Sequence, residues 1–199
     1  EVCQNLAKKI SRKSSPLIIS IAAGVQCDAI ASWLSGYAAI VRVMPNTPAQ
    51  IQAGVSALFA TPGVNETQRL QAEQILSAVG KTLWLSEEHK MDAVTAISGS
   101  GPAYVFYLIE ALQEAAIKLG LTLDEARLLS IETFAGASLL AKQSTIDIQT
   151  LRAQVTSKGG TTEQGILALE CANTKGIIQA ATEAAAKRAN ELGTLLGKG

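Results

Sequence analysis

The chain has 199 residues, which is enough for one large domain or two small ones. Hydrophobic residues make up 48% of it, enough for a packed core and too many for a disordered chain. The 17 basic residues balance the 17 acidic ones, so the composition favours neither nucleic acid nor an anionic membrane as a partner. The most apolar region, residues 93–123, contains Glu110, Glu114 and Lys118, which argues against a membrane span.

The cysteines and the histidine indicate which cellular compartment and which kinds of metal site to expect. Cys3, Cys27 and Cys171 lie far apart and form no Cys-x-x-Cys pair, a pattern typical of free thiols in a reducing compartment. The N-terminus has no charged segment followed by an apolar one, as a signal peptide has. His89 is the only histidine, so no site with several histidine ligands is expected. We therefore expect a cytoplasmic protein without a metal site.

The first half of the sequence predicts alternating helices and strands. Short apolar runs that end at glycine or proline indicate buried strands, and the run at 17–23 suits a strand of a parallel sheet. Amphipathic stretches between these runs indicate helices. The expected strands are 17–23, 39–44, 55–60 and 82–85, and the expected helices are 2–12, 28–34 and 65–79, the last capped by Asn65. This alternation is typical of a doubly wound α/β domain.

The second half predicts helices only. They are expected at 88–97, 103–119, 124–142, 148–155, 162–172 and 175–196. We place the boundary near Ser86, which predicts an α/β domain over 1–86 and an all-helical domain over 87–199. No linker rich in Pro, Gly or Ser separates them, so we expect the two parts to pack together.

The helix expected at 103–119 is apolar over most of its circumference. Pro102 suits the first helical position, and the polar residues Glu110, Gln113, Glu114 and Lys118 form one narrow stripe. A helix of this kind must be buried on most sides, and a chain this short cannot easily surround it. We therefore expect a second subunit to cover it.

The α/β part has no Gly-x-Gly-x-x-Gly turn, with which a dinucleotide-binding domain usually opens. The chain also begins abruptly within a predicted helix and without Met. We therefore expect it to be the C-terminal portion of a longer protein, with the first βαβ unit outside this sequence.

The segment 157–165, Ser-Lys-Gly-Gly-Thr-Thr-Glu-Gln-Gly, is the first candidate for chemistry. Its two glycines allow a tight turn, and Thr161 with Gln164 has the spacing of a capping box. Backbone N–H groups at such a helix start suit an anion such as a carboxylate. The alternative is an ordinary glycine turn before a capped helix.

The ends of two predicted strands, 20–25 and 43–48, are the second candidate. In open α/β sheets, ligands bind at the carboxyl ends of the strands. The small residues Ala22 and Ala23 would let a flat ring lie against the backbone, and Asn46 and Thr47 offer hydrogen-bonding groups. The alternative for the second segment is a loop bounded by prolines.

Glu87 and Glu88 at the domain junction are the third candidate, since a carboxylate there could face a cationic or N–H-bearing substrate. The alternative is a solvated helix N-terminus, which favours acidic residues. Arg42, Arg127 and Arg152 have no motif around them that sets them apart from surface charges.

Four segments together resemble the Δ1-pyrroline-5-carboxylate reductase family, which catalyses the final step of proline biosynthesis. They are Ser-Ile-Ala-Ala-Gly-Val (20–25), Val-Arg-Val-Met-Pro-Asn-Thr-Pro (41–48), Asp-Ala-Val-Thr-Ala-Ile-Ser-Gly-Ser-Gly-Pro-Ala-Tyr (92–104) and Ser-Lys-Gly-Gly-Thr-Thr (157–162). The resemblance implies the C-terminal part of a Rossmann-like NAD(P)-binding domain, followed by an all-α dimerisation domain that interlocks with a second subunit. It also implies that dimers can assemble further into decamers.

The resemblance implies a hydride transfer from NADPH, or from NADH, to C5 of Δ1-pyrroline-5-carboxylate, which gives L-proline. The residues implied near the nicotinamide are Ile21, Ala22, Ala23, Asn46 and Thr47. The choice between the two cofactors is not encoded in the segments present.

The resemblance also implies a substrate site. The backbone N–H groups of Ser157, Gly160 and Thr161 would hold the substrate carboxylate, and the Thr162 hydroxyl would lie near the ring nitrogen as the catalytic group. Glu88 matches a glutamate that contacts substrate in the family. Lys158 stands where the family usually has proline, so the turn before Gly159 is less rigid here.

Two other hypotheses remain open. A reductase acting on a 3-hydroxy acid or a 6-phosphogluconate-like substrate would need a catalytic lysine and basic ligands in the helical domain, and Ser157–Thr162 does not supply that pattern. A non-enzymatic assembly module would use the helices for dimerisation alone.

Overall fold

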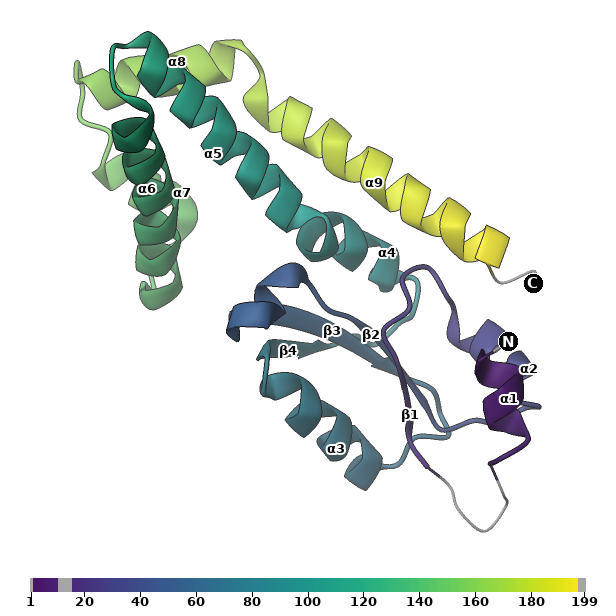
Figure 1. Cartoon of the computed structure of the whole chain (residues 1–199). Helices are drawn as coiled ribbons and strands as arrows, with labels where there is room; N and C mark the ends of the chain where they lie inside the picture. The colour runs from purple at the N-terminus through teal and green to yellow at the C-terminus, as the bar shows by residue number, and fades with distance from the viewer. Residues whose placement is uncertain (1, 11–15, 197–199) are drawn as a thin grey trace. The chain divides into compact units, whose positions relative to one another are not determined.

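A computed structural model describes residues 2–10 and 16–196 of the chain (Figure 1). Contacts divide the chain into two compact units, one containing residues 1–102 and 181–199 and the other residues 103–180. Among the described residues, no helix combines the length and the apolar character needed to cross a membrane.

The first unit contains a four-stranded sheet. Its strands are β1 (Ile18–Ser20), β2 (Ile40–Met44), β3 (Gly54–Ala60) and β4 (Gly80–Trp84), and they lie side by side in the order of the sequence. β1 pairs with β2 in parallel and β3 with β4 in parallel, whereas β2 and β3 are antiparallel. The four predicted strands are thus confirmed, and the sheet is mixed rather than wholly parallel.

The antiparallel pair has a simple physical cause. Only residues 45–53 connect β2 to β3, and the 3₁₀ helix η1 (Thr47–Ile51) occupies most of them. A parallel return needs a crossover long enough to run back along the sheet, usually through an α-helix. The two parallel pairs have such crossovers, α2 (Cys27–Trp33) and α3 (Glu66–Ser77).

Helices cover both faces of this sheet because the side chains of β2 alternate between them. Val41 and Val43 pack in one cluster with Ala72 and Leu76 of α3. Ile40 packs in a second cluster with α2 and with apolar residues of α1 (Val2–Ala7), as Figure 1 allows the reader to follow. This is the layered α/β arrangement that the sequence predicted.

The ends of the predicted elements differ in two places. Helix α1 ends at Ala7 rather than at residue 12, which lies outside the described residues. Strand β1 has three residues instead of seven, because residues 21–25 leave the sheet in a turn that places Gly24 at φ +76°. Asn65 caps α3 in a full capping box with Gln68, which confirms its predicted role.

The segment after β4 packs with the sheet unit. The predicted helix 88–97 consists of α4 (Lys90–Val94) and the π-helix η2 (Thr95–Gly99), and Met91 and Ala96 are buried. The strands end at Trp84, close to the predicted change of pattern at residue 86, yet the compact units divide after Pro102. The predicted boundary near residue 86 lies close to the end of the last described strand. The compact units follow another division, since residues 87–102 and 181–196 belong to the unit that contains the strands.

The second unit is built from helices alone in its described residues. They are α5 (Gly101–Lys118), α6 (Leu123–Gln143), α7 (Ile148–Gln154), α8 (Thr161–Cys171) and the first part of α9 (Thr174–Leu196). Their ends agree with the predicted ones to within two residues, since local caps such as Thr122 and Asp147 define them. No residue of α5 is buried within the single chain.

Candidate functional site

Two loops leave the same edge of the sheet in the first unit. β1 and β2 run parallel with Ser20 opposite Arg42, so their carboxyl ends lie together. Residues 21–25 follow β1 and residues 45–47 follow β2. Ile21 is 64% exposed, and Ala22, Ala23 and Thr47 are also exposed. The structure therefore places these residues at the edge where open α/β sheets bind ligands.

Asn46 shapes the second loop. Its side-chain oxygen Oδ1 accepts a hydrogen bond from the backbone N–H of Val55 at 2.9 Å, which joins the loop to the start of β3. The amide NH₂ of Asn46 has two further donors that this bond does not use. Asn46 can thus hold the loop and still donate to a ligand.

The loop after β1 is a tight turn. The hydroxyl of Ser20 accepts a hydrogen bond from the N–H of Ala22 at 3.4 Å, and the N–H of Val25 donates to the carbonyl of Ala22 at 3.4 Å. Gly24 is buried at φ +76°, in the left-handed region that favours glycine. The turn exposes Ala22 and Ala23, whose small side chains leave their backbone accessible.

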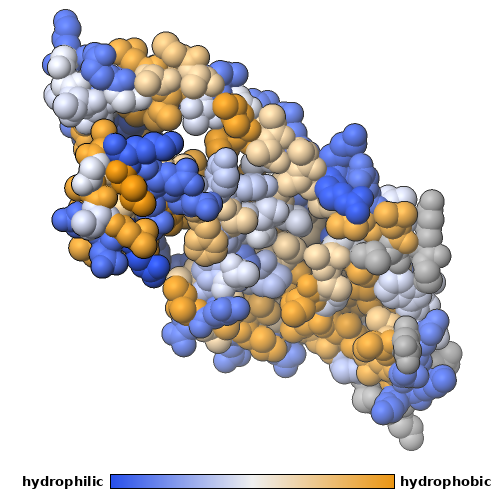
Figure 2. Space-filling model, turned by 45° about the horizontal axis from the view of Figure 1, so that its top comes forward, coloured by the Kyte–Doolittle hydropathy of each residue, from blue (hydrophilic) through white to orange (hydrophobic). Residues whose placement is uncertain are grey.

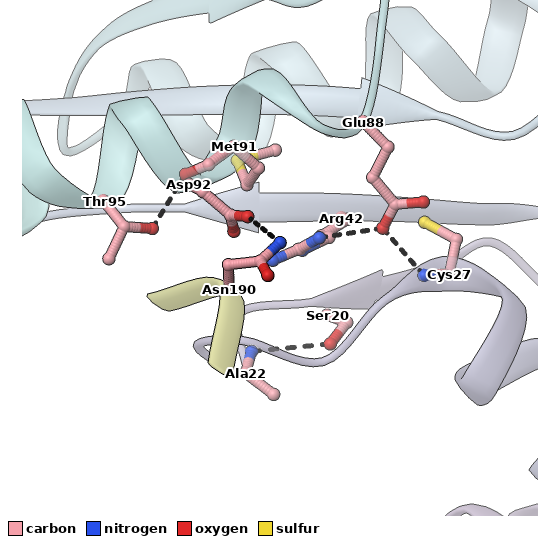
Figure 3. Close-up of polar contacts among 9 residues, drawn as sticks. All are labelled: Ser20, Ala22, Cys27, Arg42, Glu88, Met91, Asp92, Thr95 and Asn190. Carbon is pink, nitrogen blue, oxygen red and sulfur yellow. Dashed lines mark hydrogen bonds and ion pairs between the residues drawn. The ribbon is translucent and has the colours of Figure 1, made fainter. Parts of the chain in front are cut away.

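The sequence did not predict the partners of Glu88. Its Oε1 accepts from the Arg42 guanidinium at 2.9 Å and from the backbone N–H of Cys27 at 2.8 Å (Figure 3). Arg42 is 4% exposed and Glu88 is 22% exposed. This carboxylate therefore has two protein partners on one oxygen, whereas the resemblance implied that it contacts substrate.

Sequence reasoning treated Arg42 as an ordinary surface charge, and its burial corrects that interpretation. Arg42 lies in the middle of β2, and four of the five residues of this strand are buried. One charged residue inside an otherwise apolar run was the signal that could have identified it, since a buried charge needs a partner.

Cys27 is the third member of this cluster. Burial, with the Glu88 carboxylate as the second cause, raises the pKa of the Cys27 thiol to about 12. A thiol with such a pKa stays protonated at neutral pH, so it is a poor nucleophile there. Within the described residues, no group of three or more His, Cys, Asp or Glu side chains could hold a metal ion.

In the second unit, the Ser-Lys-Gly-Gly-Thr-Thr segment forms a turn that leads into α8. Gly159 has φ +75°, and the N–H of Gly160 donates to the carbonyl of Ser157 at 3.0 Å. A Cβ on Gly160 would lie 2.5 Å from the Ser157 hydroxyl and 3.1 Å from the Ser157 carbonyl, so a larger residue would require the Ser157 side chain to turn away. Ser157, Thr161 and Thr162 are exposed.

The predicted capping box between Thr161 and Gln164 is wrong. Gly160 occupies the N-cap position of α8 and has no side chain to accept a hydrogen bond. The Glu163 carboxylate instead accepts from the N–H of Gly159 at 2.7 Å. Because no side chain of the described chain caps α8, the first N–H groups of this helix are left for solvent or a ligand.

The predicted site residues therefore form two groups. Ile21, Ala22, Ala23, Asn46, Thr47 and Glu88 belong to the first compact unit, and Ser157, Gly160, Thr161 and Thr162 belong to the second. In the first unit the two loops leave adjacent strand ends, and in the second the four residues lie in one turn and the helix start that follows it. The roles of these residues in binding remain predictions.

The fold and these loops define a class of protein: one with part of a Rossmann-like domain followed by an all-helical part. Residues 88–192 match the family model described as pyrroline-5-carboxylate reductase dimerisation. The chain belongs to the pyrroline-5-carboxylate reductase family.

Similar proteins agree with this assignment. The pyrroline-5-carboxylate reductase of Pseudomonas aeruginosa is 44% identical over 197 residues, which cover 99% of this chain and 71% of the relative. The structure of the Coxiella burnetii enzyme has a TM-score of 0.91 and 46% identity, covering 96% of this chain and 70% of that one. A Plasmodium falciparum pyrroline carboxylate reductase with NADP bound has a TM-score of 0.86 and 33% identity, covering 96% of this chain and 76% of that one.

Proposed function

We propose that this chain carries the reductase function of its family, the reduction of Δ1-pyrroline-5-carboxylate to L-proline with NADPH, or with NADH, as the hydride donor. The observation that carries the proposal is the uncapped start of α8 behind the Gly159-Gly160 turn. Free N–H groups at a helix N-terminus bind a carboxylate well, and the substrate has one.

The loops after β1 and β2 fit the nicotinamide end of the cofactor. Ile21, Ala22 and Ala23 are exposed, and the alanines carry no side chain that would hold a flat ring away from the backbone. Asn46 and Thr47 supply amide and hydroxyl groups for the carboxamide. When bound, NADPH would supply the hydride that C5 of the cyclic imine gains, and the ring nitrogen takes its additional proton from solvent.

The turn before α8 holds the substrate in this proposal. The N–H groups of Ser157 and Thr161 bind the carboxylate, aided by the positive end of the helix dipole. The N–H of Gly160 already donates to the Ser157 carbonyl, so it joins them only by sharing its hydrogen or by opening that bond. In this proposal Glu88 has a structural role in place of the substrate contact that the resemblance implied, because its carboxylate pairs with the buried Arg42 and accepts from the N–H of Cys27.

Thr162 acts as the catalytic residue. Its hydroxyl lies at the second position of α8, where it can hydrogen-bond the ring nitrogen of a substrate whose carboxylate rests on the helix start. A protonated imine is a better hydride acceptor, because the positive nitrogen draws electron density from C5. The protein then contributes mainly by holding the two reactants close together, and no covalent nucleophile is needed.

We further propose a cytoplasmic homodimer that forms through the helical part of the chain and can assemble into a decamer, with no nucleic acid or membrane as a partner. The dimerisation family match covers α5 to α8 and α9 as far as residue 192, and these helices expose many apolar side chains (Figure 2). Examples are Phe106 and Tyr107 on α5, Leu140 on α6 and Ile177 on α9. Such faces are normally covered by a partner.

The experiment is a reductase assay with pyrroline-5-carboxylate that follows the loss of reduced nicotinamide absorbance. It is run on this chain and on a form extended at its N-terminus by a complete dinucleotide-binding βαβ unit. Activity that falls by about a hundredfold in Thr162→Ala supports the proposal, since removing one group that stabilises the transition state has effects of this size. Thr194→Ala, which removes an exposed hydroxyl that bonds only its own helix at Asn190, is the control.

A folded dimer of the extended form without any activity would contradict the proposal. The helical part would then be best explained as an assembly module.

A further inference from the structure

The ion pair between Arg42 and Glu88 has no part in the proposed chemistry. The Arg42 side chain is nevertheless buried, at 4% exposed. Taking a guanidinium out of water is costly unless its partner is well placed. Arg42 is also too deeply buried to contact a ligand bound at the sheet edge. Within the described part of the chain, the guanidinium pairs with the Glu88 carboxylate at 2.9 Å. The pair therefore serves the structure around it.

The same Glu88 oxygen caps a helix. Gln26, the N-cap residue of α2, makes no side-chain capping bond, and the N–H of the next residue, Cys27, donates to Glu88 Oε1 at 2.8 Å. A negative charge at a helix N-terminus is favourable because it faces the positive end of the dipole. Glu88 thus supplies from far along the chain the cap that the local sequence lacks.

Residues 21–26 lie between two points that Arg42 connects. At one end, the backbone of Arg42 is the sheet partner of Ser20, the last residue of β1. At the other end, its guanidinium holds the carboxylate that caps α2 (Figure 3). The segment between them contains Ile21, Ala22 and Ala23, the residues we assign to the nicotinamide.

We propose that Arg42 and Glu88 are positioning residues that hold the loop 21–26 in its binding conformation and thereby raise the affinity for the reduced dinucleotide. Neither residue touches the cofactor or the substrate. This inference rests on the proposed function and gives Glu88 a role different from substrate contact. It predicts an effect on cofactor affinity that is separate from substrate affinity.

The test measures KM for NADPH, KM for pyrroline-5-carboxylate and kcat in the protein form that is active in the reductase assay. Glu88→Gln keeps an oxygen for the Cys27 N–H and removes the charge, and Arg42→Met removes the guanidinium. We expect each variant to raise KM for NADPH by about tenfold, with KM for pyrroline-5-carboxylate and kcat changed by less than about twofold. Glu87→Gln is the matched control, because Glu87 is an exposed neighbour that pairs with Lys90.

The double variant Arg42→Met/Glu88→Gln separates a shared role from two independent ones. If both residues act through one contact, KM for NADPH rises in the double variant by much less than the product of the two single effects. A product of the single effects would overturn the inference. So would a Glu88→Gln variant that raises KM for pyrroline-5-carboxylate and leaves that for NADPH unchanged, which would return Glu88 to the substrate site.

Two further readouts keep the test decisive. Circular dichroism monitors folding, and if Arg42→Met does not fold, Arg42→Lys takes its place, since it keeps the charge but loses the reach and fork of the guanidinium. If the wild type binds NADPH by fluorescence titration but reduces no pyrroline-5-carboxylate, the proposed function fails, and a tenfold weaker Kd in the variants still supports the positioning role. An unchanged Kd in those variants would overturn it.

Discussion

The carbonyl oxygen of Gly24 and the backbone of Gly193 lie so close that a Cβ on Gly193 would sit 2.8 Å from that oxygen. Gly24 belongs to the turn after β1, and Gly193 to the C-terminal end of α9, within the same compact unit. Nearby, the Asn190 amide of α9 donates to Asp92 of α4 at 3.1 Å (Figure 3). The last helix therefore packs directly on the loop that we assign to the nicotinamide.

This contact predicts the effect of a side chain at Gly193. Glycine in a helix usually weakens it by about 0.5–1 kcal/mol relative to alanine, so Gly→Ala in an open helical position stabilises. At Gly193 the close carbonyl reverses the sign, and we expect Gly193→Val to lower the free energy of unfolding by about 1–3 kcal/mol, as overpacking does. Urea denaturation measures it.

The control for that substitution is Gly136→Ala in α6, where a Cβ would meet no atom within 4 Å in the chain. It should leave stability unchanged or raise it slightly. A Gly193→Val protein as stable as the wild type would show that the end of α9 moves away from the turn at little cost.

A charge on α5 tests the dimer. No residue of this helix is buried in the single chain, although its sequence is apolar on most sides. Ala111→Glu would place an unpaired charge against the partner, and we expect the dimer to dissociate roughly a hundredfold more readily, or not to form at all. Sedimentation measures the assembly state. Glu114→Gln, in the polar stripe of the same helix, should leave the dimer intact, and a fully dimeric Ala111→Glu would place the interface elsewhere.

The Cys27 thiol predicts a pH dependence. Its pKa is raised from 9.0 to about 12 in the folded chain, by burial first and by Glu88 second. Below pH 9 the thiol is protonated in both states, and its full contribution to stability is present. As pH rises from 9 to about 12, the thiol loses its proton in the unfolded state first, so the free energy of unfolding falls. Urea unfolding of the wild type and Cys27→Ala over this range measures the effect. Equal slopes in the two proteins would contradict it, and Cys171→Ala, at an exposed cysteine, is the control.

The capping box of α3 predicts a local loss of stability. Asn65 accepts from the N–H of Gln68 at 2.9 Å, and the Gln68 side chain accepts from the N–H of Asn65 at 3.0 Å. Asn65→Ala should lower the free energy of unfolding by about 1 kcal/mol, because the backbone N–H of Gln68 loses its partner. Asn65→Asp keeps the accepting oxygen and should restore most of it. Thermal unfolding compares the three proteins, and an unchanged midpoint in Asn65→Ala would argue that water replaces the cap fully.

Much of the fold follows from local patterns. Asn65 signalled the start of α3, and the short apolar runs predicted all four strands, because apolar patterning and helix capping depend on residues that are close in sequence. The candidate loops were likewise predictable, since each directly follows a strand or precedes a helix. The capping of α8 was not predictable in this way. Gly160 takes the N-cap position in place of Thr161, and the Glu163 carboxylate binds the N–H of Gly159.

What the sequence determined by itself was the class of each element and the position of the two candidate sites in the chain. Only the tertiary structure decided that β2 and β3 run antiparallel, that Arg42 is buried, and that Glu88 caps α2. The reason is physical. Propensity, periodicity and capping act between near neighbours, whereas a buried ion pair and a glycine contact depend on where packing brings distant segments, and no local pattern records that.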